Sequence, residues 1–195
     1  MGVENLSIAI MTEKEWVEEM MEHLTQMTLY LIEKSLPGIP GIDVDMAWWW
    51  EDMCYNHGPL VSPKIFEELM VPRYKRITDT LKKHNVDINV LDCDGRIYEL
   101  VPGWLKGGIN CMFPIEAAHT DPLKLREEYG RDVLLFGGVN KIQLARGRDA
   151  IDREMARLRP LVEKGGYIPT VDHRVPPDVS FENYLYYLDK KKSIL

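Results

Sequence analysis

Polar residues recur where the apolar runs of this chain end, and this pattern constrains the fold more than any other feature. The recurring clusters are Asp92 with Asp94, then Glu116, then Asn140 with Lys141, then Asp172 with His173. Each cluster follows an apolar run and precedes a helical pattern. In a parallel βα array, the carboxyl ends of the strands are where the chemistry lies. The sequence therefore predicts an α/β fold, part of a (β/α) barrel with a polar mouth.

Helical and strand patterns alternate along the chain. The capping-box pair Thr12 and Glu15 predicts a helix over residues 12–33, and Ser62 with Pro63 predicts another over 62–84. The remaining predicted helices cover residues 97–106, 122–129, 141–145, 149–163 and 181–192. The predicted strands cover residues 42–50, 88–92, 109–115, 133–138 and 167–172. Strict alternation of this kind implies a parallel sheet with right-handed crossovers.

The length limits how much of a barrel the chain can form. The sequence has 195 residues, whereas a complete eight-stranded α/β barrel usually needs about 250. Five strands also fall short of eight. We therefore expect a single domain over residues 1–195 that forms a partial TIM barrel with five parallel strands.

Charge and composition exclude some classes of binding partner. The net charge of −7 argues against nucleic acid and against an anionic membrane surface. No apolar run is long enough to span a membrane, and the first residues lack the pattern of a signal peptide. Three cysteines without a CxxC pair argue against a disulfide framework, so we expect a cytoplasmic location. The expected partner is a small-molecule substrate.

Asp92 and Asp94 stand two residues apart at a strand end, so their side chains point to the same side and Cys93 points to the other. Two carboxylates on one side can bind a metal, share a proton or hold a cationic group of a substrate. The structural alternative is a helix N-cap followed by a turn at Asp94-Gly95. One turn does not need both carboxylates, which favours a functional role.

The other candidate site residues lie at the remaining strand ends. His173 is a catalytic candidate, because it stands at a strand–loop junction before two prolines, although a lone histidine is more often structural. The candidates for substrate binding are Glu51, Asp52, Glu116 and Lys141. Three consecutive tryptophans, residues 48–50, could line the site, but a place in the core is the more common role for them.

At these residues the chain resembles the uroporphyrinogen decarboxylase (URO-D) superfamily, which also contains the zinc-dependent methyltransferases of corrinoid systems. The matching stretches are GPLVSPKIFEELMVPRYKRI, DCDG, NCMFPIEAAHTDPLKLREEYG, LFGGVNKIQLARG and GGYIPTVDHRVPPDVSFENYLYYL. The resemblance implies a TIM barrel with its site at the carboxyl ends of the strands. It also implies that this chain corresponds to the later five βα units, and that about three more precede them in family members.

The resemblance also implies roles for single residues. His173 matches the histidine that follows the last strand of the decarboxylases. In the methyltransferases, an His-x-Cys pair and a later cysteine hold zinc, and the matching positions here are Asp92, Asp94 and His173. An Asp/Asp/His set can still bind a divalent metal, with harder character than a thiolate site. Such a site is poorer for activating a thiol.

Three functional hypotheses follow. The first is a decarboxylase-like carboxy-lyase of porphyrin biosynthesis, acting on a tetrapyrrole or another carboxylated substrate through His173, Asp92 and Asp94, without a cofactor. The second is a methyltransferase with a divalent metal such as zinc on the same three residues and a corrinoid protein as partner. The third is a non-catalytic subunit that forms a homo-oligomer or binds a partner supplying the missing N-terminal strands of the barrel.

Overall fold

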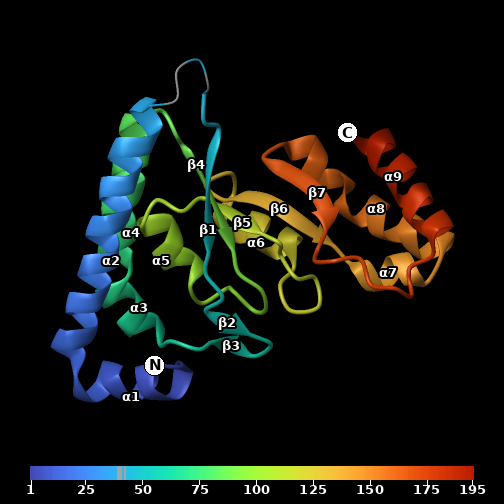
Figure 1. Cartoon of the computed structure of the whole chain (residues 1–195). Coiled ribbons are helices and arrows are strands. Elements are labelled where there is room, and N and C mark those ends of the chain that lie inside the picture. The colour runs from blue at the N-terminus through green and yellow to red at the C-terminus, as the bar shows by residue number, and fades with distance from the viewer. Residues whose placement is uncertain (39–40, 42) are drawn as a thin grey trace. The chain divides into compact units, whose positions relative to one another are not determined.

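The computed structural model describes residues 1–38, 41 and 43–195 (Figure 1). The helices are α1 (Val3–Thr12), α2 (Lys14–Ser35), the short 3-10 helix η1 (Leu36–Gly38), α3 (Pro63–Leu69), α4 (Val71–Lys83), α5 (Val101–Lys106), α6 (Pro122–Tyr129), α7 (Lys141–Ala145), α8 (Arg148–Lys164) and α9 (Phe181–Ile194). The strands are β1 (Met46–Trp50), β2 (Cys54–Tyr55), β3 (Gly58–Pro59), β4 (Ile88–Asp92), β5 (Cys111–Phe113), β6 (Leu134–Val139) and β7 (Tyr167–Val171).

Five of the strands form one sheet in the order β1-β4-β5-β6-β7, and β2 and β3 form a small antiparallel hairpin. The pairs β4–β5, β5–β6 and β6–β7 are parallel, with helices between successive strands. This confirms the α/β fold. In the described part of the chain, β1 and β7 stand at the two ends of the strand order, as expected of a partial barrel.

The residues group into two compact units, which are described separately. The first unit comprises Met1–Ala47, Val61–Asn89 and Leu100–Ile109. The second unit comprises Trp48–Leu60, Val90–Glu99 and Asn110–Leu195. The expectation of a single domain over residues 1–195 stays a prediction.

In the first unit, α2 lies along α4 (Figure 1). The two terminal guanidinium nitrogens of Arg76, Nη1 and Nη2, donate to the Glu22 carboxylate, at 2.7 and 2.8 Å. These hydrogen bonds lower the pKa of Glu22 to about 2. Trp104 is fully buried and packs edge-on against Phe66, with ring centroids 5.6 Å apart. A bidentate ion pair therefore joins α2 to α4, and apolar burial joins α3 to α5.

In the second unit, helices cover one face of the sheet. Leu91, Met112 and Leu135 lie side by side across β4, β5 and β6, and all three are buried. Helix α8 packs against β6, β7 and α9, and Figure 1 shows α8 beside β7. Val90 and Cys111, at the alternate positions of β4 and β5, are buried as well, so the loops at the strand ends are left to form the site.

The two long predicted helices are each interrupted. A helix over residues 12–33 was expected, but α1 ends at Thr12 and α2 begins at Lys14. The capping-box prediction was wrong because the Thr12 hydroxyl donates to the Ile8 carbonyl at 3.0 Å, inside α1, instead of capping α2.

The predicted helix over residues 62–84 begins as expected. Ser62 accepts a hydrogen bond from the Ile65 N–H, and Pro63 follows it at the first helical position. The helix breaks at Met70, between α3 and α4. Pro72 explains the break, because proline has no N–H to donate to the preceding turn.

The remaining differences are short. The helix expected over 97–106 begins at Val101, and the Ile97 N–H donates to the Thr120 hydroxyl at 3.2 Å. Strand β1 covers the later part of the expected 42–50, and residue 42 lies outside the described residues. In the described part of the chain, no helix is both long and apolar enough to cross a membrane. The three cysteines are free, as expected.

Candidate active site

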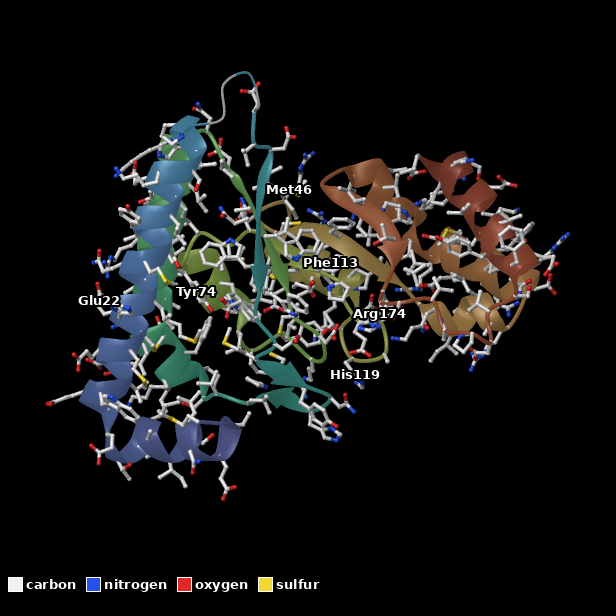
Figure 2. All side chains as sticks on the ribbon, viewed as in Figure 1. Glu22, Met46, Tyr74, Phe113, His119 and Arg174 are labelled. Atoms are coloured by element: carbon white, nitrogen blue, oxygen red, sulfur yellow. The ribbon has the colours of Figure 1, made fainter. Side chains whose placement is uncertain are left out.

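The candidate site residues lie in the second unit, at the carboxyl ends of its parallel strands. They are Asp92 at the end of β4, Asp94 just beyond it, Glu116 after β5, Lys141 at the start of α7 after β6, and His173 after β7. Figure 2 labels His119 and Arg174 on the loops that follow β5 and β7. The fold thus gathers these side chains at one edge of the sheet, as the sequence predicted.

Asp94 and His173 form the first contact of the site. Nε2 of His173 lies 3.5 Å from Oδ2 of Asp94, and both side chains are about two-fifths exposed. The other oxygen of Asp94, Oδ1, is buried and has no hydrogen-bond partner among the described residues. An enclosed carboxylate oxygen without a donor favours the protonated acid.

Glu116 and Lys141 form the second contact. Nζ of Lys141 lies 3.6 Å from Oε1 of Glu116, and each side chain is about one-fifth exposed. The second oxygen of Glu116, Oε2, accepts a hydrogen bond from the Gly95 N–H at 3.1 Å. Glu116 therefore ties the loop that follows β5 to the residue next to Asp94.

Asp92 faces an aromatic cluster on the sheet. Trp48 donates its indole N–H to Oδ2 of Asp92 at 3.3 Å. The Trp48 ring packs edge-on against Phe113, with centroids 4.9 Å apart, and Phe113 against Phe136, at 5.0 Å. Figure 2 labels Phe113 within the sheet. Trp48 is about half exposed, so this tryptophan lines the site and the core role favoured for it was wrong.

Glu51 and Asp52 follow β1. The Glu51 N–H donates to the Asp92 carbonyl at 2.9 Å, which places the end of β1 beside the end of β4. Asp52 is exposed, and its charge acts on both Asp92 and Asp94. All the candidate residues after the strands are therefore brought together, with Glu51 joined through its backbone.

Burial sets the protonation behaviour of the two aspartates. Burial raises the pKa of Asp92, and the neighbouring charges of Asp94 and Asp52 raise it further, against the Trp48 hydrogen bond. Burial also raises the pKa of Asp94, with the charges of Glu116 and Asp52 adding to it, against His173. Cys93, between them, is buried.

Replacing Asp92 with asparagine is expected to stabilise the protein near pH 7. A raised folded-state pKa means that folding keeps the ionised carboxylate at a cost, and this cost disappears when pH falls below the ordinary aspartate pKa of about 4. The free energy of unfolding of the variant at pH 7 should exceed that of the wild type by up to about 1 kcal/mol, and its melting temperature should be higher. At about pH 3.5 the two proteins should have nearly the same stability.

Circular-dichroism melting at both pH values measures this effect, with Asp178→Asn as the control. Asp178 is exposed on the loop before α9, so its replacement should leave the pH dependence unchanged. An equal gain from Asp92→Asn at both pH values would contradict the assigned cost.

The metal hypothesis requires Asp92, Asp94 and His173 to converge. Among the described residues, no group of three or more His, Cys, Asp and Glu side chains is placed to hold a metal ion. Asp94 contacts His173, whereas Asp92 accepts a hydrogen bond from Trp48. The binding of a divalent metal by Asp92, Asp94 and His173 stays a prediction.

Two residues of the site were not among the sequence candidates. Trp48 was read as a core residue, and only its contact with Asp92 reveals its place. Asp172 was recognised at a strand end but not included, although it is buried beside the candidate residues. The signal that could have identified Asp172 from the sequence is its position directly before His173.

Comparisons with known proteins give one family match and one similar fold. The family model described as Uroporphyrinogen decarboxylase (URO-D) matches residues 1–193. A solved structure, described as a methyltransferase from Methanosarcina mazei, superposes with a TM-score of 0.72 at 16% sequence identity. The match covers 99% of this chain and 54% of that one, so this chain spans about half the length of that structure. No curated protein sequence matches the chain.

Proposed function

Because the chain belongs to the uroporphyrinogen decarboxylase family, we propose that it carries the proton-transfer part of a decarboxylase-like site. The observation that carries the proposal is Asp94, with a raised pKa, one oxygen against His173 and one enclosed oxygen without a partner. A carboxylic acid held in this way is suited to donate a proton.

Decarboxylation requires a proton donor and stabilisation of the developing charge. When the bond between a substrate carbon and its carboxylate breaks, carbon dioxide leaves and the bonding electron pair stays on the carbon. Asp94 delivers a proton to that carbon, and His173 returns one to Asp94 from the solvent. Lys141 offers a positive charge to a substrate carboxylate, while Asp92 and Asp52 favour N–H groups such as those of a tetrapyrrole.

The test is anaerobic incubation with uroporphyrinogen, with carbon dioxide release and product carboxylate number as readouts. The wild type should release carbon dioxide, and in D₂O the product should gain one deuterium for each carboxylate lost. Asp94→Asn and His173→Ala should each slow release by about 100-fold or more, the usual contribution of a positioned proton donor. Asp121→Asn is the control, because Asp121 caps α6 and pairs with Arg157 instead of with Asp94 or His173.

Unchanged release in Asp94→Asn would contradict the proposed role of Asp94. Absence of release from the wild type, with any of several carboxylated tetrapyrroles, would contradict the decarboxylase proposal. The second candidate function is a methyltransferase of a corrinoid system, and the solved neighbour is described as a methyltransferase. Transfer of a methyl group from methylcobalamin to a thiol, lost in Asp92→Ala, would support it.

We also propose a homo-oligomer formed through α2. Trp16, Leu24, Met27 and Leu31 are each about half exposed and recur at helical spacing on one side of this helix. Glu13 lies at one end of this apolar stripe and Lys34 at the other. A second copy in antiparallel orientation would therefore cover the stripe and set each Glu13 beside the opposite Lys34.

Sedimentation velocity should show the wild type as a dimer and Leu24→Glu as a monomer, because a charge in the stripe would be buried unpaired. Phe181→Glu is the matched control, since Phe181 is an exposed apolar residue of α9. A wild type that stays monomeric at high concentration, or a Leu24→Glu variant that still dimerises, would contradict this assignment.

A further inference from the structure

Asp172 is a buried carboxylate, 1% exposed, that accepts two hydrogen bonds from two different loops. Its Oδ2 accepts from the Ala117 N–H at 2.9 Å, and its Oδ1 accepts from the Lys141 N–H at 3.1 Å. Asp172 itself follows β7, while its two donors follow β5 and β6. One side chain therefore joins the ends of three neighbouring strands.

The two donors belong to the Glu116–Lys141 pair. Ala117 directly follows Glu116, and the second donor is the backbone of Lys141 itself. Glu116 in turn accepts from Gly95, next to Asp94. The residue after Asp172 is His173, which contacts Asp94. Both contacts of the site are thus anchored at this carboxylate.

We propose that Asp172 is a positioning residue that fixes the loops after β5 and β6, so that Glu116 and Lys141 face the Asp94–His173 pair. This role rests on the proposed function only for its consequence in catalysis. Capping of α7 explains only the Lys141 hydrogen bond of Asp172, because the Ala117 N–H that Asp172 also accepts lies outside that helix.

The position suits a carboxylate and not its amide. A carboxylate accepts hydrogen bonds on both oxygens, which is what two converging N–H groups require. Asparagine has one accepting oxygen, so its NH₂ group would face one of the two donors and leave that N–H buried without an acceptor. Asp172→Asn should therefore release one loop while keeping the size of the side chain.

The first test measures the Glu116–Lys141 interaction with a double-mutant cycle in urea unfolding, using Glu116→Gln, Lys141→Met and the pair together. The cycle is run in the wild type and in Asp172→Asn, because a general loss of stability does not change a pairwise coupling. We expect a measurable coupling in the wild type and none in Asp172→Asn. Asp121→Asn, another aspartate that accepts a backbone N–H, should keep the coupling.

Amide hydrogen exchange supplies the second readout. Asp172→Asn should speed exchange at the Ala117 or Lys141 amide by about tenfold or more, while amides in α8 keep their rates. If Asp172→Asn does not fold, the wild type decides: both amides must be protected about as strongly as those of β6, and fast exchange at either would overturn the proposal.

A coupling and exchange rates unchanged by Asp172→Asn would overturn the positioning role. The outcome is separate from the test of the proposed function, since neither readout needs turnover. Loss of coupling together with an inactive wild type would leave Asp172 as the positioning residue and remove only the decarboxylase proposal. In an active preparation, Asp172→Asn should lower activity without changing the exchange rates of α8.

Discussion

Replacing Gly137 with alanine is expected to destabilise the second unit by about 2–4 kcal/mol, the sum of overpacking and backbone strain. Gly137 lies in β6 at φ 114°, a backbone conformation that favours glycine. An added methyl group would overlap the carbonyl oxygen of Pro114. That oxygen accepts the Gly138 N–H at 2.9 Å, so relief of the overlap would break a bond between β5 and β6.

Urea unfolding followed by circular dichroism measures this loss. Gly147→Ala is the matched control, because Gly147 also has a positive φ, 97°, but a methyl group there would meet no atom within 4 Å. Only the backbone strain of about 1 kcal/mol should remain in the control. Equal losses in the two variants would show that the Pro114 carbonyl can move away without cost.

Replacing Trp104 with alanine is expected to cost about 3–5 kcal/mol, the usual range for removing a fully buried large aromatic side chain. Trp104 lies in α5, is 0% exposed and packs against Phe66. Neighbouring side chains would have to collapse into the space, and a packed core does so only in part. Thermal and urea unfolding of the variant measure the loss.

Trp50→Ala is the control for the same change of residue type. Trp50 is 79% exposed, so its removal should change the free energy of unfolding by no more than about 0.5 kcal/mol. Trp104→Phe should recover part of the lost stability, because phenylalanine fills most of the space. A loss from Trp50→Ala as large as that from Trp104→Ala would contradict the assignment of Trp104 as buried and Trp50 as exposed.

Local signals in the sequence were sufficient for several elements. Strand 88–92 was predicted with the bounds that β4 has, and helices 122–129 and 141–145 match α6 and α7. Each rests on residues next to the element: an apolar run for β4, Asp121 with Pro122 for α6, and Asn140 for α7. These signals act through backbone hydrogen bonds over a few residues, which a sequence displays directly.

The breaks in the long helices show where such signals compete. Thr12 has the residue type of an N-cap, but its hydroxyl donates back into α1. Pro72 stands in a helical pattern, and its missing N–H ends α3 before α4 begins. Both residues were visible in the sequence, and the choice between two local bonds was made by the packed structure.

The sequence by itself determined the α/β alternation, the family and the residues that stand at the strand ends, because apolar periodicity and chain order are local properties. Only the tertiary structure decided which of those residues meet. Asp172 bonds Ala117 across 55 residues of sequence and Lys141 across 31, and Trp48 reaches Asp92 across 44. These contacts depend on strand register and on which face each side chain takes, and both are fixed when the strands pair.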